Sequence, residues 1–445
     1  MSQEQIVITL IVFSVVILLI AMDWLDLAVA GLLGVSVLIG LGILNQEDIL
    51  SGARTGGGAL SLLFGGMVVA RTLRSTGIFE RFGDLFLKAT RGSGRRFVLL
   101  LVVVVAPLCA FLPNAITVIM LAPIVIRVSK ALEVDFVGPM VLTAILSNSA
   151  GLLTLAGDPA TFLVGSACGM TFTAYLKKVS LGGLLALGAI VPLLPVLMRE
   201  LWNIRQPLTV KTPPEPIRRP GFALASLIVL MLMVGTFIFG EFLPTPIVPP
   251  GAAIIAASLA LLLIYCVRVE PVDRVIHDID FKSLIFIACS LMLVEAVSKT
   301  GLLQSLSLKM VDWFGAELAL VALILLAGVG LLSGILANIP VVAASLLMLK
   351  GYLVAAAVVP ETALIDGFTD WPAASLPVFV AMMFGATLGG NATVIGASAN
   401  VVAAGICSAN GGSLTFTRFM RYGLPIVGTQ LAVSALYVLG MFWIS

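Results

Sequence analysis

The chain has 445 residues, of which 60% are apolar and 11% are charged, and its mean hydropathy is +1.16. Soluble domains carry about 25% charged residues, so this composition predicts an integral membrane protein. The formal net charge of +2 is too small and too dispersed for nucleic-acid binding. The five cysteines form no Cys-x-x-Cys pair, and no Walker loop or dinucleotide fingerprint occurs. We therefore expect no disulfide framework, no metal site, no cofactor and no enzymatic activity.

Eight apolar stretches are long enough to cross a bilayer as helices, because a hydrocarbon core of about 30 Å needs about 20 apolar residues. They comprise residues 6–22, 27–44, 56–75, 176–198, 221–243, 249–267, 283–298 and 424–443. The first stretch has no basic segment before it and no small-residue cleavage site after it. We interpret it as a retained helix and not as a signal peptide.

Two further apolar segments contain a turn that predicts a re-entrant hairpin. Residues 97–112 would form only about 24 Å of helix at about 1.5 Å per residue, which is shorter than the hydrocarbon core of about 30 Å. The chain then turns at a Pro-Asn step that ends in Asn114 and continues apolar, which predicts a hairpin over 97–130. The segment 321–358 repeats this pattern around Asn338.

Two long segments, 136–170 and 372–407, can cross the bilayer but are interrupted at their centres by Gly, Asn, Thr and Pro. We expect them to form broken helices. With the eight uninterrupted stretches they give ten crossings. Because ten is even, both chain ends lie on the same side of the membrane, which we expect to be outside the cytoplasm. Most of the 25 lysine and arginine residues then fall on the cytoplasmic side, as the positive-inside rule requires.

The two halves of the chain repeat one another. A shift of 224 residues aligns Asn114 with Asn338, and a shift of 239 aligns the Gly-x-x-Thr-x-x-Gly runs that begin at Gly151 and Gly390. Each unit has five crossings, and because five is odd the second unit enters the membrane upside down. The sequence thus predicts an all-α fold of two inverted repeats, each with a re-entrant hairpin and a broken helix, which is typical of secondary transporters.

Domain boundaries follow from the repeat. We place the first repeat at residues 1–198 and the second at 221–445, joined by a cytoplasmic linker over 199–220 that contains five prolines. The hairpins and broken helices are expected to move as one unit against a scaffold formed by the spans 6–44 and 221–267. A homodimer interface on this scaffold is one interpretation.

The interrupted segments bring neutral polar side chains to the expected midplane. Backbone groups freed inside a membrane must be satisfied by protein or must line a wet cavity, so amides and hydroxyls at these positions are candidate substrate ligands. The candidates are Asn114, Thr117, Asn148, Thr154, Asn338, Thr387, Asn391 and Thr393. An amide at a deep turn is unfavourable without an occupant or a partner, which favours a binding role for Asn114, Asn338 and Asn391. For Ser147 and Ser398 we favour capping of the broken ends.

Asp158 is the one carboxylate that the sequence places at a helix break. An acid inside a membrane is a functional-site hypothesis by default, so Asp158 is the candidate for proton or ion coupling. Alternatively, Asp158 and Pro159 form an N-cap followed by proline at the first helical position. Arg71 and Glu295 are interpreted as charges that extend toward water from helix ends.

Two motifs around the breaks carry a resemblance to a known superfamily. They are Ser147 to Pro159, with the sequence SNSAGLLTLAGDP, and Gly389 to Asn400, with the sequence GGNATVIGASAN. They resemble the ion transporter superfamily, in the branch that holds arsenite/antimonite efflux permeases, sodium/proton antiporters, the pink-eyed dilution protein and a citrate-transporter-like domain. The resemblance covers nearly the whole chain. It departs from the family at the hairpin tips, where Pro113 and Ala337 replace the aspartate of the family's Asp-Asn pairs.

The resemblance implies a proton-coupled antiporter for arsenite and antimonite efflux, an arsenic-resistance function in the bacterial inner membrane. Uncharged, hydroxyl-rich arsenous acid suits a pocket of amides and hydroxyls, and the missing hairpin aspartates weaken a sodium/proton assignment. Two alternatives stay open. One is a carboxylate transporter for citrate or a dicarboxylate, or a sodium/proton transporter, of the same fold. The other is a channel subunit driven by a separate soluble ATPase. The expected partners are a small inorganic oxyacid or anion and the lipid bilayer.

Overall fold

The computed structural model describes residues 2–22, 24–206, 219–365 and 367–444. These residues form helices joined by turns and loops, and they contain no β-strand. Eleven of their helices are long and apolar enough to cross a membrane. Many large apolar side chains are exposed, as expected where a protein faces lipid. The protein is an all-helical integral membrane protein, as its composition predicts.

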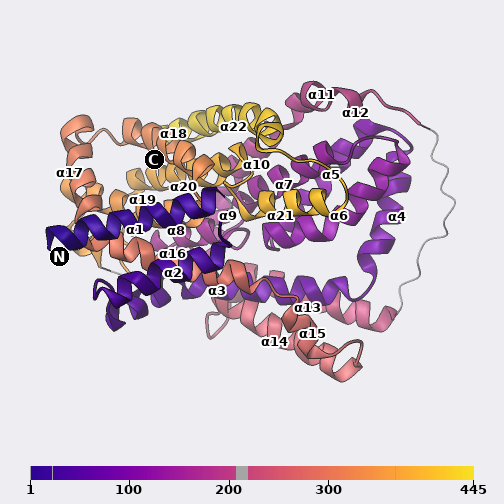
Figure 1. Ribbon diagram of the computed structural model, residues 1–445, viewed down its shortest axis with the longest axis horizontal. Helices are drawn as coiled ribbons and strands as arrows, with labels where there is room; N and C mark the ends of the chain where they lie inside the picture. Colours follow the sequence, from indigo (N-terminus) through magenta and orange to yellow (C-terminus); the bar gives the residue numbers. More distant parts are fainter. Residues whose placement is uncertain (1, 23, 207–218, 366, 445) are drawn as a thin grey trace.

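The order of the elements can be followed in Figure 1. The first half contains α1 (Gln3–Ala21), α2 (Leu27–Gly40), α3 (Gln46–Arg74), α4 (Ile78–Thr90), α5 (Gly94–Cys109), α6 (Asn114–Ala131), α7 (Val137–Ala150), η1 (Gly151–Leu153), α8 (Pro159–Ala167), α9 (Phe172–Lys178), α10 (Ser180–Gly188), η2 (Val191–Leu193), α11 (Leu194–Leu197) and α12 (Arg199–Trp202). The second half contains α13 (Pro220–Phe239), η3 (Gly240–Phe242), α14 (Pro249–Val267), α15 (Val272–His277), α16 (Phe281–Lys299), α17 (Leu302–Phe314), α18 (Leu318–Ile335), α19 (Asn338–Ala355), η4 (Glu361–Leu364), η5 (Ala373–Ser375), α20 (Leu376–Gly389), η6 (Gly390–Ala392), α21 (Ser398–Ala409) and α22 (Phe416–Ile444). Of the five linker prolines, Pro207, Pro213, Pro214 and Pro216 lie outside the described residues, and Pro220 begins α13.

Helix–turn–helix units occur at both predicted hairpins. The first consists of α5 and α6, and the second of α18 and α19. In each unit the second helix begins with asparagine, Asn114 or Asn338, after one residue with extended backbone angles (φ −57° and ψ 137° at Pro113, φ −61° and ψ 140° at Ala337). The two tips therefore present the same amide at the same local geometry.

Both predicted helix interruptions are present, and glycine is what allows them. The chain leaves α7 through η1 and an extended segment before α8, and it leaves α20 through η6 and an extended segment before α21. Each extended segment returns against the start of its own break. A Cβ on Gly157 would lie 2.6 Å from the carbonyl oxygen of Gly151, and a Cβ on Gly396 would lie 2.5 Å from that of Gly390. A side chain at either position would push the two backbone segments of the break apart.

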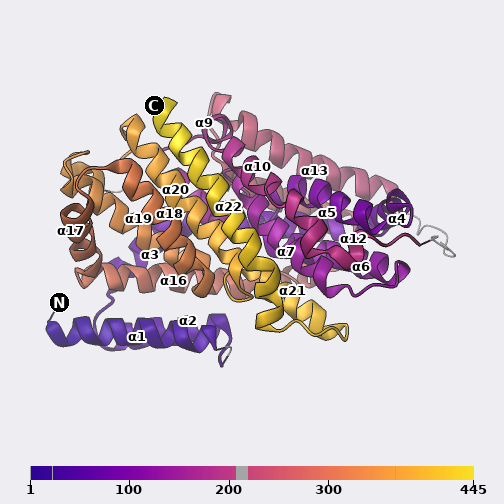
Figure 2. The ribbon, with the colours of Figure 1, turned by 90° about the horizontal axis from the view of Figure 1, so that it is seen from above.

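The elements of the two halves follow one another in the same order, so that α4 to α8 correspond to α17 to α21. Both α4 and α17 begin after a glycine in the left-handed region, Gly77 at φ 75° and Gly301 at φ 76°. In Figures 1 and 2 these two helices lie at opposite ends of the molecule. Figure 2 also shows α1 and α2 side by side along one edge, where α2 packs against α16.

Ion pairs connect α3 to the segment before α16 and to the last residue of α16. Arg71 lies in the last turn of α3, as expected, but its guanidinium does not simply extend to water. It donates to Glu270 with an Nη2–Oε2 distance of 3.0 Å and to Asp278 with an Nε–Oδ2 distance of 2.7 Å. At the other end of α16, Lys299 pairs with Asp48 at an Nζ–Oδ2 distance of 2.7 Å. Arg71 therefore has a structural role and lies outside the polar cavity described below.

The close approach inside the second break gives a first prediction. Gly396→Ala should lower the free energy of unfolding by about 1–3 kcal/mol, because the added methyl overpacks against backbone, and the apparent Tm in detergent should fall. Gly405→Ala on α21 is the matched control, since no atom lies within 4 Å of its added Cβ and alanine favours the helix. Equal melting temperatures for the two variants would contradict the packing described for the break.

Candidate functional site

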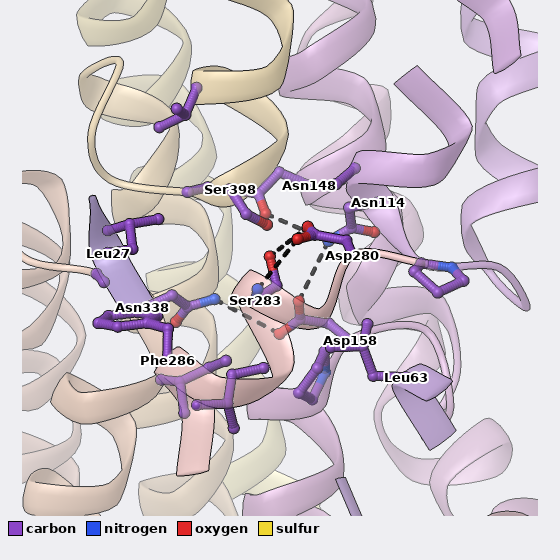
Figure 3. Close-up of a pocket in the computed structure, with 18 of the residues that line it drawn as sticks. Leu27, Leu63, Asn114, Asn148, Asp158, Asp280, Ser283, Phe286, Asn338 and Ser398 are labelled. Atoms are coloured by element: carbon purple, nitrogen blue, oxygen red, sulfur yellow. Dashed lines mark hydrogen bonds between the residues drawn. The ribbon is translucent and has the colours of Figure 1, made fainter. Parts of the chain in front are cut away.

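A cavity of about 90 Å³ lies where both hairpin tips and both interrupted helices meet. Its apolar wall includes Leu27, Leu63 and Phe286, and the close-up in Figure 3 shows these around a group of polar side chains. The polar residues that line the cavity are Asn114, Asn148, Asp158, Asp280, Ser283, Asn338 and Ser398. Residues from α6, α7, α8, α16, α19 and α21 thus come together although they are far apart in the sequence.

Asp158 lies at the centre of this group and is 8% exposed. Its carboxylate accepts from the amide of Asn114 (Nδ2–Oδ1 3.2 Å) and from that of Asn338 (Nδ2–Oδ2 3.5 Å), which approach from two directions in Figure 3. It also accepts from the backbone N–H of Ala160 at 3.0 Å and caps α8, with proline at the first helical position. The predicted capping role is confirmed. The same carboxylate also joins the two hairpin tips, which capping alone does not require.

A second set of amide contacts joins the two broken helices to each other. The Asn148 amide donates to Asn391 (Nδ2–Oδ1 3.1 Å) and to the Thr387 carbonyl oxygen (3.3 Å). Asn391 donates in turn to Ser149 Oγ at 2.9 Å and to Gln430 Oε1 at 3.2 Å. Asn148 lines the cavity, whereas Asn391 does not line it and instead holds Asn148 from behind.

The four candidate threonines are buried and do not line the cavity. Thr154 and Thr393 each follow the short 3-10 turn of a break. The Thr154 hydroxyl donates to the Ala110 carbonyl oxygen of the first hairpin, and the Thr393 hydroxyl donates to the Gly334 carbonyl oxygen of the second at 2.6 Å. Thr117 donates to the carbonyl oxygen of Pro113 at 3.3 Å. The hydroxyl oxygen of Thr387 has no hydrogen-bond partner in the part of the chain that the structure describes. Thr154 and Thr393 therefore connect separate backbone segments, whereas the Thr117 contact lies within the first turn of α6.

The cavity contains more acceptors than its own donors satisfy. Asn114 Oδ1 and Asn338 Oδ1 are buried and, within the described residues, have no hydrogen-bond partner. An acceptor left unpaired in an apolar interior costs about 1–3 kcal/mol. Both amides already use an N–H on Asp158. The unpaired oxygens thus favour an occupant that donates hydrogen bonds or carries positive charge.

Asp280 is the cavity residue that sequence reasoning missed. It precedes α16, accepts from the Ser283 backbone N–H at 3.1 Å and from the Ser283 hydroxyl, and faces the cavity in Figure 3. The Asp-x-x-Ser pattern at the start of an apolar run predicts only an N-cap. The cavity thus holds two carboxylates. Among the described residues that line it, none is Lys, Arg or His.

Two hairpins whose tips meet two interrupted helices around a polar cavity define a secondary transporter. The chain belongs to the citrate transporter family, whose profile matches residues 17–365. An uncharacterised transporter from Synechocystis is 40% identical over 430 residues, which cover 96% of this chain and 95% of the relative. A 46 kDa membrane protein from Mycobacterium leprae is 29% identical and covers 97% of this chain and 98% of its own length.

Two more distant matches also cover most of this chain. The human P protein is 26% identical over 85% of this chain and 53% of its own length. The crystal structure of the YdaH transporter from Alcanivorax borkumensis aligns with a TM-score of 0.59 at 12% identity and covers 90% of each chain. The resemblance to the ion transporter superfamily is therefore confirmed, and the protein is a transporter and not an enzyme.

The amide bridge between the broken helices gives a second prediction. Asn148→Ala should destabilise the protein by about 1–3 kcal/mol, because it removes the amide donor to the Asn391 side-chain oxygen and to the Thr387 carbonyl oxygen inside the membrane. Asn410→Ala at the exposed end of α21 is the matched control, since its amide donates only to the Ile406 carbonyl oxygen. Thermal unfolding in detergent measures both. A Tm for Asn148→Ala within error of the wild-type value would contradict the bridging role.

Proposed function

We propose that this secondary transporter exports a small, uncharged, hydroxyl-rich oxyacid in exchange for protons, with arsenous acid and its antimony analogue as the leading substrates. The unpaired amide oxygens of Asn114 and Asn338 carry this proposal. The hydroxyls of such an acid can donate to these oxygens and to Asp158. An ionised carboxylate group has no hydrogen to donate, and it would meet two carboxylates with no Lys, Arg or His among the described residues of the lining.

The size of the cavity supports a small substrate. About 10–15 Å³ is enough to hold one water molecule, so a cavity of about 90 Å³ admits a solute of a few heavy atoms. The hydrogen-bond acceptors come from three elements, α6, α8 and α19, and this arrangement suits a compact molecule with several hydroxyls. The direct ligands in this proposal are Asn114, Asn148, Asp158 and Asn338. Asn391, Thr154 and Thr393 hold the breaks around them, and Thr117 and Thr387 are buried beside the site without touching the cavity.

Proton exchange follows from competition for Asp158. When the carboxylate is charged, it accepts hydrogen bonds from both hairpin tips and can also accept a substrate hydroxyl. When it is protonated, one oxygen becomes a donor and the set of acceptors is smaller. A proton and the substrate would thus bind the same group in turn, which is the requirement for exchange.

The membrane arrangement that we propose is the one expected from the sequence. Residues 1–198 and 221–445 are inverted repeats, the linker over 199–220 is cytoplasmic, and the bilayer is the bacterial inner membrane. The matching order of α4 to α8 and α17 to α21 and the opposite placement of α4 and α17 support this arrangement. The scaffold formed by α1, α2, α13 and α14 is the proposed homodimer interface.

A carboxylate such as citrate is the second candidate, because the family profile carries the description of a citrate transporter. In this cavity a carboxylate would need protonation or an accompanying cation to offset Asp158 and Asp280. A bare cation, as in sodium/proton exchange, is favoured by the same oxygen groups, since hard cations prefer oxygen ligands. The three substrates therefore differ in the charge that crosses the membrane with them.

Reconstituted vesicles with an imposed pH gradient and no ATP separate these candidates. We expect arsenite and antimonite to move in the direction opposite to the proton flux, without a soluble ATPase. Citrate should neither be transported nor compete with them. Citrate movement without arsenite movement would overturn the arsenite proposal in favour of the second candidate. Proton flux driven by sodium alone would favour the third.

Asp158→Asn tests the coupling role in the same vesicles. Asparagine still caps a helix, so the variant should fold. The rate of arsenite exchange should fall by at least about tenfold, which corresponds to about 1.4 kcal/mol of activation free energy. The matched control is Asp26→Asn, because Asp26 caps α2 through the Ala28 N–H at 3.0 Å, the same contact that Asp158 makes in α8. Undiminished exchange in Asp158→Asn would restrict Asp158 to capping.

A further inference from the structure

An apolar groove of about 330 Å³ lies between the first hairpin and α13, away from the Asp158 cavity. Its walls come from α5, from the end of α3 together with α4, and from α13. Every residue that lines it is leucine, isoleucine, valine, phenylalanine or proline. Val103 on α5 is 68% exposed and Leu227 on α13 is 38% exposed. The groove therefore opens on the outer surface of the helix bundle, which in an integral membrane protein faces lipid.

One end of the groove lies at the turn between α3 and α4. Leu73 at the end of α3 and Ile78 at the start of α4 both line it. In Figure 1, α4 runs crosswise at one end of the molecule, whereas α3 and α13 run along its length. Other residues of α4, such as Arg81 and Lys88, are exposed. A helix with one apolar side and basic residues elsewhere is typical of the membrane interface.

The chain around this end of the groove is rich in basic residues. Those of the segment 74–96 are all exposed, and they are Arg74, Arg81, Lys88, Arg91, Arg95 and Arg96. The acidic residues of the same segment are Glu80 and Asp84, and Asp84 already pairs with Arg127 at an Nη1–Oδ1 distance of 2.7 Å. The positive charge of this segment is therefore only partly offset within it.

Two of these arginines adjoin the groove in the sequence. Arg74 directly follows Leu73, and Arg81 directly precedes Phe82, and both of these neighbours line the groove. Neither arginine forms an ion pair within the part of the chain that the structure describes. An apolar channel that begins beside unpaired guanidinium groups matches a ligand with an anionic head and a hydrocarbon tail.

The groove reaches from α4 to the tip of the first hairpin. Its α5 wall extends from Val103 to Leu112, and Leu112 directly precedes Pro113 at the tip. The helix α4 is fixed to the same hairpin, because Asp84 pairs with Arg127 of α6 and the Phe86 ring meets the Phe97 ring of α5 edge-on at 6.0 Å. A molecule in the groove therefore contacts the first hairpin on one side and α13 on the other.

We propose that this groove binds an anionic phospholipid, with one acyl chain between α5 and α13 and the phosphate at Arg74 and Arg81. Basic residues at a membrane surface attract anionic lipids, and a guanidinium binds phosphate oxygens through paired, charge-assisted hydrogen bonds. The site goes beyond the proposed function, because the lipid is not transported and Asp158 is not used. The bound chain fills the space beside the hairpin whose tip carries Asn114.

Native mass spectrometry of the full-length protein, purified in detergent, tests the site by measuring the affinity of the tightest-bound lipid. The probes are phosphatidylglycerol and phosphatidylcholine with identical acyl chains. We expect phosphatidylglycerol to bind at least about tenfold more tightly, because basic groups favour the anionic headgroup. Arg74→Gln together with Arg81→Gln should remove this preference. Val103→Trp places a large ring in the groove and should weaken the binding of both lipids by at least about tenfold.

Matched controls lie outside the groove. Lys177→Gln together with Lys178→Gln removes two exposed charges on α9, and Leu331→Trp adds a ring at a residue of α18 that is 72% exposed. Both control proteins should bind phosphatidylglycerol as wild type does. Equal affinity of the wild-type protein for the two lipids would overturn the anionic ligand, and unchanged binding in Val103→Trp would overturn the groove as its site. Neither readout involves arsenite, so the failure of this proposal and that of the transport proposal are distinguishable.

Discussion

The absence of water inside a bilayer is the constraint on which this structure depends. Breaking a helix there frees backbone N–H and C=O groups, and each freed group needs a partner from the protein itself. This chain breaks two helices beside one cavity, and neighbouring side chains bind the breaks. Glycines let each break close on itself, as at Gly157 and Gly396, and Thr154 and Thr393 bind each break to a hairpin. The interrupted helices are stable because the hairpins pack beside them.

The groups that remain after these contacts define the site. Asn148 and Asn391 use their amides to hold the two broken helices together, and Asp158 uses its oxygens to hold both hairpin tips. The amide oxygens of the tips then have no protein donor among the described residues. Unpaired acceptors on residues that line a cavity favour a solute that supplies hydrogen-bond donors. Removing Asp158 from this arrangement would release both tips together.

Much of this arrangement could be predicted from the sequence, because the length of a bilayer-spanning helix is a strict requirement. Segments too short to cross, with Asn114 or Asn338 at a turn, predicted the hairpins, and glycine-rich runs predicted the breaks. The location of Asp280 could not be predicted, since its neighbours in sequence indicate a loop and only the packing of α16 brings it to the cavity. The contacts of Thr154 and Thr393 could not be predicted either, because their carbonyl partners lie 44 and 59 residues away in the sequence.

The central claim is that a solute with hydroxyl donors binds between Asp158, Asn114 and Asn338. Anomalous diffraction from crystals soaked in antimonite tests it most directly, because antimony scatters strongly and marks its own position. Our account predicts an anomalous peak inside the cavity, within hydrogen-bond reach of Asp158 through the oxygens of the solute, and its loss in Asp158→Asn crystals. An antimony peak confined to cysteine sulfurs or to the surface, with the cavity empty at saturating antimonite, would contradict it.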